Sequence, residues 1–266
     1  MLFFQFILLS GICSFYPNYG CRTDDLSDSS KATYLLHEGD SLADEGKCKQ
    51  AIPLYLASIT ILKNNGPWDK LVKSYNELGW CYIDQSRHDI ALDSLKSGLV
   101  IGKKFLGDDH NEVLSNLSNT SGLYRVMGDY EKSIQLLTLI MEKDIKKYSP
   151  FHLIVAADYN NIGLTYSDMA DYDIAITYYE QALRIALPAF GEKHIKIAFT
   201  YNNIGNAYLH KKEFTKALEN YNKSIEIFEN VFGKPNSVCA ATYDNMGLAY
   251  RLLKQYDASL FYAKKG

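Results

Sequence analysis

The chain has 266 residues, of which 47% are hydrophobic and 22% are charged, and this composition excludes a disordered tail. Its formal net charge of −3 gives no long-range attraction to phosphate backbones or anionic lipid, which disfavours nucleic acid as a partner. The sequence contains five cysteines in no CxxC pair, too scattered to suggest a disulfide framework: Cys13, Cys21, Cys48, Cys81 and Cys239.

Residues 1–21 are expected to be a signal peptide or a membrane anchor. The apolar run of residues 2–12 is shorter than the ~20 residues that a spanning helix needs, and it suits the h-region of a secretory signal. No Lys or Arg precedes this run and no A-x-A cleavage site follows it, while Gly20-Cys21 is faintly similar to a lipoprotein acceptor site. We therefore expect an exported protein, periplasmic, outer-membrane-associated or secreted, with a cytoplasmic location as the alternative.

Residues 22–32 are polar and rich in serine, which predicts a flexible linker. From about residue 33 onward the hydrophobic pattern is helical throughout. The array is therefore expected to occupy residues 33–266.

A repeat organises this array. The segment Tyr201-Asn202-Asn203-Ile204-Gly205 has an earlier copy that begins at Tyr159 and a later copy that begins at Tyr243, at equal distances along the chain. A fixed period of about 42 residues is typical of a solenoid, in which each unit packs only on its neighbours.

Each repeat alternates two amphipathic helices, which we call helix A and helix B. Small residues recur in helix A, and because a glycine inside a helix costs ~1 kcal/mol against alanine, their recurrence predicts a close crossing of the two helices. Cys81 occupies a small-residue position shared with Ala207 and Ala249 and is expected to be buried. The recurring glycines are Gly39, Gly79, Gly163, Gly205 and Gly247.

The pattern resembles the tetratricopeptide repeat, whose hallmark is W/Y-x2-L-G-x2-Y followed by Ala and an aromatic residue. The fifth unit matches it at Tyr201, Ile204, Gly205, Tyr208, Ala217 and Tyr221, whereas the third unit is degenerate. The long period and the LG-x-x-H-like turns at residues 106–110 and 190–194 are similar to the kinesin-light-chain subtype. The resemblance implies an all-α, right-handed α-α superhelix of five repeats plus a truncated sixth.

No catalytic or nucleotide-binding motif is present, so we expect no enzymatic activity and no cofactor. His110, His152 and His194 recur at the repeat period and invite a metal hypothesis. Zinc needs its nitrogens within ~2.1 Å, whereas equivalent residues of successive repeats are separated by whole helices. We therefore interpret these histidines as turn residues, and predict no metal.

An asparagine ladder is the best candidate binding site. Its members share one helix A position and are Asn119, Asn161, Asn203 and Asn245. The position is similar to an asparagine series that binds peptide backbones in tetratricopeptide proteins, and an amide can both donate and accept. The alternative is a set of hydrogen bonds between repeats, and Glu77 departs from the series in the second unit. Neighbouring groove residues are expected to be Asn160, Asn202, Arg125 and Arg251.

The sequence thus predicts a protein–protein interaction scaffold that binds a peptide or protein of unknown identity on its concave face. No polar capping helix follows the sixth repeat, so one alternative is the N-terminal sensory region of a larger signalling enzyme, a histidine kinase or a CHAT-type peptidase. Another is self-association through the apolar face of Leu248, Leu252 and Leu260. Membrane contact is expected only through the N-terminal segment.

Overall fold

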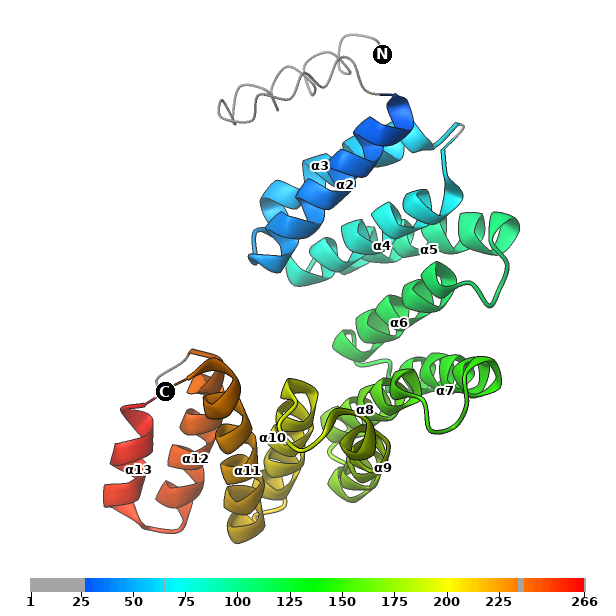
Figure 1. Cartoon of the computed structure of the whole chain (residues 1–266). Helices are drawn as coiled ribbons and strands as arrows, with labels where there is room; N and C mark the ends of the chain where they lie inside the picture. Colours follow the sequence, from blue (N-terminus) through cyan, green and yellow to red (C-terminus); the bar gives the residue numbers. More distant parts are fainter. Residues whose placement is uncertain (1–26, 65, 234–236, 266) are drawn as a thin grey trace. The chain divides into compact units, whose positions relative to one another are not determined.

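The computed structural model describes residues 27–64, 66–233 and 237–265 (Figure 1). These residues are helical with short turns and contain no strand. Chain order alternates helix A and helix B, as the period predicted: α2 (Asp28–Asp44), α3 (Cys48–Leu62), α4 (Trp68–Asp84), α5 (His88–Phe105), α6 (Asn111–Val126), α7 (Tyr130–Lys147), α8 (Leu153–Asp168), α9 (Tyr172–Phe190), α10 (Ile195–His210), α11 (Phe214–Phe232), the 3-10 turn η2 (Ser237–Cys239), α12 (Ala240–Leu252) and α13 (Tyr256–Ala263). The predicted all-α repeat solenoid is confirmed.

The first helix begins earlier than the sequence indicated. We expected residues 22–32 to be a linker, but α2 starts at Asp28, inside that segment. The Ser27 hydroxyl accepts a hydrogen bond from the Ser30 backbone N–H, and Asp28 lies in the first turn, where the helix dipole favours a negative charge. The polar, serine-rich composition therefore marks a capped helix start rather than a linker at this end.

The expected signal peptide or anchor at residues 1–21, and the acceptor-like Cys21, lie outside the described residues and stay predictions. Among the helices that are described, none has both the length and the apolar character needed to cross a bilayer.

The chain divides into two compact units, residues 1–123 and 124–266, and the division falls within α6. In the first unit, α2 packs on α3, α3 on α4 and α4 on α5 (blue to cyan-green in Figure 1). Its core contains Leu36, Tyr55, Leu71 and Leu95, all contributed by the inward faces of these helices.

In the second unit, each helix from α7 to α13 packs on the next one along the chain. Its core runs from Val155 through Tyr179 and Tyr221 to Met246, so its repeats contribute to one continuous apolar interior. A solenoid is stabilised by such contacts between neighbours and has no single centre.

In four repeats a large side chain of helix B lies directly on the glycine of helix A, whereas a Cβ placed on Gly247 of the sixth would make only ordinary contacts at 3.4 Å. A Cβ placed on Gly205 would be 2.6 Å from the Tyr221 ring, and one on Gly163 would be 2.7 Å from the Tyr179 ring. Both rings are essentially inaccessible to solvent, so neither can move away. The predicted close crossing of the two helices is confirmed.

The three histidines of the long turns cap the helices that follow them. The Nδ1 atoms of His110, His152 and His194 accept hydrogen bonds from the backbone N–H two residues later, each at 3.2 Å. Their interpretation as turn residues is therefore confirmed, with N-capping as the physical role. In the part of the chain that the structure describes, no group of metal-ligating residues is assembled.

We predict that Gly205→Ala lowers the free energy of unfolding by about 1–3 kcal/mol, because the new methyl group overpacks against the buried Tyr221 ring. Thermal and urea unfolding followed by circular dichroism would measure the change. The matched control is Gly122→Ala in α6, where an added Cβ meets no atom within 4 Å. There the better helix propensity of alanine should stabilise the chain by up to about 1 kcal/mol. Equal effects at both positions would contradict the close-crossing explanation.

Candidate functional site

All four asparagines of the ladder are half-buried on their A helices, but they differ in what they contact. In the first unit, Asn119 Nδ2 donates to the Asn76 backbone carbonyl at 3.4 Å, from α6 to α4. In the second unit, Asn245 Nδ2 donates to Asn206 Oδ1 at 2.9 Å, from α12 to α10. At these two positions the amide forms the contact between repeats that we weighed as the alternative to ligand binding.

Asn206 is the centre of a longer connection. Its Oδ1 also accepts from the Tyr221 hydroxyl at 2.8 Å. This one amide oxygen of α10 therefore connects α11 of the same repeat and α12 of the next repeat. Asn245 is therefore engaged by the scaffold.

Asn161 and Asn203 differ from these two. Their side-chain amides make no hydrogen bond to any other residue within the described ranges, although both are half-buried. They lie at equivalent positions of α8 and α10, neighbouring A helices of the second unit. A half-buried amide without a protein partner retains its hydrogen-bonding capacity for water or for a ligand.

The predicted groove residues Asn160 and Asn202 have a scaffold role. Asn160 Oδ1 accepts from Thr200 Oγ1 at 3.2 Å, and Asn202 Oδ1 accepts from Thr242 Oγ1 at 2.9 Å. Each bond joins helix A of one repeat to helix A of the next. In the first unit the equivalent bond runs from Asn116 Nδ2 to Asn76 Oδ1 at 2.6 Å.

Sequence reasoning missed the donors of these bonds, a polar residue that recurs five positions before the helix A glycine position. The series is almost fully buried and consists of Ser74, Asn116, Asp158, Thr200 and Thr242. A polar residue that recurs on the apolar face at the repeat period is the signal that could have found them. Buried polar groups require partners, and here the neighbouring repeat supplies most of them.

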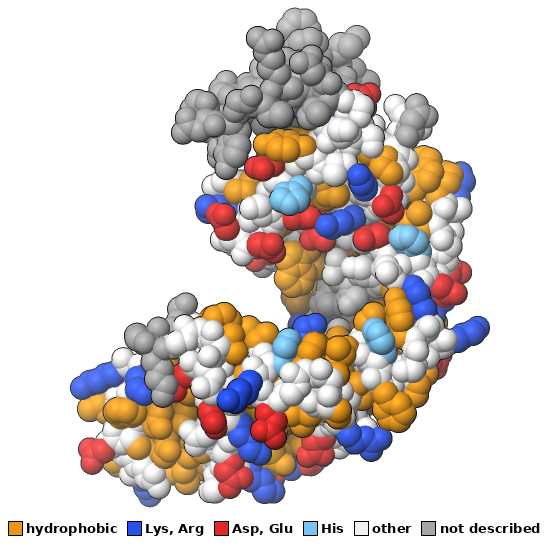
Figure 2. Space-filling model, in the orientation of Figure 1, with side chains coloured by type: hydrophobic (Ala, Val, Ile, Leu, Met, Phe, Trp, Pro, Cys, Tyr) orange, Lys and Arg blue, Asp and Glu red, His pale blue; other side chains and the backbone are white. Residues whose placement is uncertain are grey.

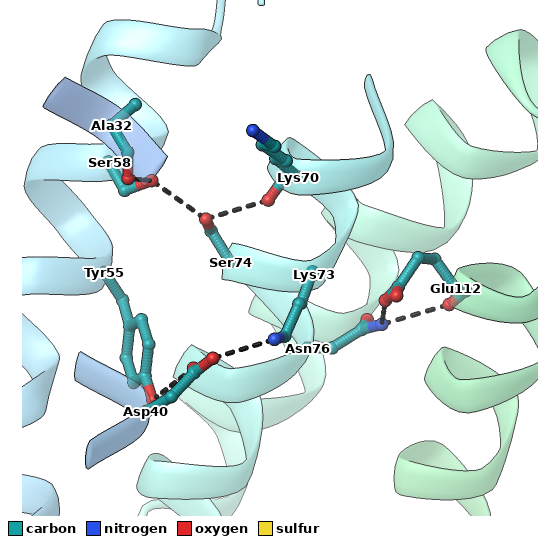
Figure 3. Close-up of polar contacts among 9 residues, drawn as sticks. All are labelled: Ala32, Asp40, Tyr55, Ser58, Lys70, Lys73, Ser74, Asn76 and Glu112. Carbon is teal, nitrogen blue, oxygen red and sulfur yellow. Dashed lines mark hydrogen bonds and ion pairs between the residues drawn. The ribbon is translucent and has the colours of Figure 1, made fainter. Parts of the chain in front are cut away.

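The first unit shows how closely such bonds are spaced (Figure 3). Ser58 and Ser74 join α3 to α4 through their hydroxyls at 3.0 Å, and Lys73 of α4 pairs with Asp40 of α2 at 2.7 Å. Asn76 donates to the Glu112 backbone carbonyl at 3.0 Å.

Glu77 takes the ladder position in this unit. Burial, and then the negative charge of Asp40, raise its pKa to about 7 despite the nearby Lys73. A carboxyl group near half-protonation at neutral pH both donates and accepts, as an amide does. Glu77 can therefore form hydrogen bonds of the same kinds as the asparagines at this position, although it differs from them in sequence.

The two arginines of the predicted groove also differ. Arg125 is ion-paired with Asp168, which joins α6 to α8 within the second unit. Arg251 lies exposed in the last turn of α12, with no salt bridge to any other described residue. The face drawn in Figure 2 shows basic and acidic side chains interspersed with apolar ones, without a large field of one sign.

One member of the buried polar series lacks the usual partner. Asp158 of α8 contacts Asp144 of α7, and the two carboxyl groups are 6% and 4% exposed. Burial, and then the charge of Asp144, raise the pKa of Asp158 to about 7, and burial also raises the pKa of Asp144. The pair therefore retains a proton under conditions where exposed carboxyl groups have lost theirs.

We predict that Asp158→Asn raises the free energy of unfolding at pH 8 by about 1–3 kcal/mol. The folded-state pKa of Asp158 is raised above its ordinary value of 3.8, so its contribution to stability is full below pH 3.8 and is lost as the pH rises to about 7. Asn116 at the equivalent position shows that an amide fits. Melting curves at pH 5 and pH 8 would measure the effect.

The control for this variant is Asp257→Asn, which changes an exposed carboxyl group in α13. It should leave the difference in melting temperature between the two pH values unchanged, whereas Asp158→Asn should reduce it. An unchanged pH dependence in Asp158→Asn would contradict the buried carboxyl pair.

The paired helices, the helix A glycines and the capped long turns define a helical repeat protein. The family model for the tetratricopeptide repeat matches residues 112–187 and 196–266, more than half of the chain, so this chain belongs to the tetratricopeptide repeat family. A comparison with curated protein sequences finds no match.

Several solved structures share this fold. BtubC (BKLC) from P. vanneervenii is 16% identical, with a TM-score of 0.64 over 92% of this chain and 89% of that one. A putative kinesin light chain from Podosopora anserina with nearly identical TPR-like repeats is also 16% identical, with a TM-score of 0.61 over 78% and 99%. NprR, solved in complex with its cognate peptide NprX, is 18% identical, with a TM-score of 0.64 over 90% and 67%.

Proposed function

We propose that this chain is a protein-interaction scaffold that binds an extended segment of a partner protein or a peptide along the A helices of its second unit. The observation that carries the proposal is the pair Asn161 and Asn203. These amides occupy the same position of adjacent repeats and are the two ladder members without a hydrogen bond among the described residues. The neighbouring polar residues that fix the stack already have partners, so the free pair is not needed for it.

The spacing of the two asparagines suits a peptide backbone. Packed helices lie about 8–10 Å apart, and an extended chain rises about 3.3 Å per residue. Asn161 and Asn203 would therefore meet backbone groups about three residues apart. Because an amide can pair with both an N–H and a C=O, such contacts bind a peptide without regard to its side chains.

Selectivity would then come from residues beside the pair. Leu164 of α8 is half-buried one turn after Asn161. Arg251 would offer a positive charge at the α12 end. A segment with an apolar side chain beside Leu164 and an acidic residue towards α12 would fit this arrangement.

The fold is compatible with this function. The NprR structure named above was determined with a peptide bound, so a helical array of this type can accommodate a peptide in that protein. The identity of 18% shows the fold alone, and the proposal for this chain rests on its own asparagine pair.

We predict that Asn161→Ala/Asn203→Ala weakens peptide binding about 10-fold or more, since each lost hydrogen bond is worth about 0.5–1.5 kcal/mol. Peptides would be selected with the unaltered chain from a random display library, and dissociation constants measured by fluorescence anisotropy. Circular dichroism would verify that the variant melts like the unaltered chain.

The matched control is Gln181→Ala/Asn220→Ala, which removes two amides from the B helices α9 and α11. It should leave binding unchanged. A second comparison, Asn160→Ala/Asn202→Ala, should lower the melting temperature because it removes the acceptors of Thr200 and Thr242. The binding face would be wrong if the folded Asn161→Ala/Asn203→Ala variant bound selected peptides as tightly as the unaltered chain.

A further inference from the structure

Two cysteines face each other between the first and second repeats. Cys48 is the first residue of α3 and Cys81 lies in α4, and their side chains are 4% and 0% exposed. The Cys81 thiol donates to the Cys48 sulfur, and the two Sγ atoms are 2.7 Å apart. A covalent S–S bond is about 2.05 Å long, so a small rotation of both side chains would bring the atoms to bonding distance.

The equivalent interfaces of later repeats use different residues. The position of Cys48 is aromatic in the last four helix B segments, where it is held by Tyr130, Tyr172, Phe214 and Tyr256, and it is His88 in the second. The position of Cys81 is held by Leu123, Thr165, Ala207 and Ala249. The repeat period therefore pairs an aromatic residue of one repeat with a small residue of the next at the last three repeat interfaces. Cysteine occupies both positions only between the first two repeats. A thiol replaces the ring at the one interface where the opposite residue is also a thiol.

Cys48 lies at a pocket, whereas Cys81 is enclosed. A pocket of about 560 Å³ is lined by residues 46–50 and 84–86, so Cys48 forms part of its wall. Burial raises the pKa of both thiols, and the carboxyl group of Asp84 adds to this for Cys48. The S–H of Cys81 points at Cys48 and favours ionisation of Cys48 over that of Cys81. Cys48 is thus the cysteine of the pair that lies nearer to the pocket.

We propose that Cys48 and Cys81 are a redox modification site that closes an intrachain disulfide between α3 and α4. The oxidant is an external disulfide, either a small molecule of the glutathione type or a protein. The Cys48 thiolate attacks one sulfur of that disulfide, its S–S bond breaks, and the first thiol leaves with a proton.

The second half of the reaction uses the enclosed thiol. The Cys81 sulfur loses its proton, attacks Cys48 Sγ and displaces the second external thiol. Two cysteine thiols are then oxidised to one disulfide while one external disulfide is reduced to two thiols. High thiol pKa values make the exchange slow in the folded chain, and the same burial shields the finished bond from reductants.

The bond would lock the first two repeats together. It closes the chain around the turn between α3 and α4, which restricts the unfolded state more than the folded one. It is independent of the asparagine pair, which lies in the other unit, so its failure and the failure of the proposed binding face are separate results.

The test uses the full chain incubated with oxidised glutathione and then digested without reduction. Mass spectrometry is expected to find the peptides that contain Cys48 and Cys81 joined, with a mass lower by two hydrogens than their sum. Dithiothreitol should separate them. The oxidised chain should melt about 5 °C or more above the reduced chain.

Two variants make the result specific. Cys48→Ser/Cys81→Ser should lose the difference in melting temperature between oxidised and reduced samples, whereas Cys239→Ser, which changes another buried cysteine, should retain it. The proposal is overturned if Cys48 and Cys81 of the oxidised chain, once unfolded, are both still alkylated as free thiols, or if either is joined to a different cysteine.

Discussion

The close approach of a helix B ring to a helix A glycine is the contact on which the rest of the structure depends. Tyr221 lies against Gly205, and Tyr179 against Gly163, at distances that leave no room for a Cβ atom. This contact sets the separation of the two helices in a repeat. Each repeat packs only on its neighbours. Tyr55 makes the same ring contact with Gly39 in the first unit, whereas Leu95 lies against Gly79 and Ala263 against Gly247. The third repeat carries Ser121 and Leu137 at these positions, and the division between the two compact units falls in its helix A.

A second constraint comes from polar groups that the stacking buries. Thr200 and Thr242 would be costly to bury alone, and each hydroxyl lies within hydrogen-bonding distance of an asparagine of the preceding repeat, with the Lys196 carbonyl as a second acceptor for Thr200. The side-chain amides of Asn119 and Asn245 likewise donate hydrogen bonds to residues of the preceding repeat. What remains available for a partner is therefore what the stack does not use, the amides of Asn161 and Asn203. The proposed binding site therefore contains two of the four ladder asparagines, Asn161 and Asn203.

The repeat period predicted the helix pairs, the glycine contacts and the turn role of the histidines. Each of these features depends on residues within one repeat, so the same residue types recur at the repeat period. Asn160 and Asn202 were expected in a groove because helix periodicity places them beside the ladder. Both also accept hydrogen bonds from threonines, Thr200 and Thr242, which belong to the next repeat and lie 40 residues away. Periodicity within one helix does not show which side chains meet across a repeat interface.

Taken alone, the sequence determined the fold class, the repeat period and most of the residues that must be small. Steric exclusion at a helix crossing requires a small residue there, and most repeats carry one at the same position. Only the tertiary structure decided which polar residues are free. Asn203 and Asn245 occupy the same position of the repeat, yet Asn245 donates a hydrogen bond to Asn206 of the preceding repeat and Asn203 makes no equivalent bond. Likewise, Cys48 and Cys81 are scattered in sequence and meet only because α3 packs on α4. Hydrogen bonds and thiol contacts depend on distances of a few tenths of an ångström, which the packing of whole helices sets.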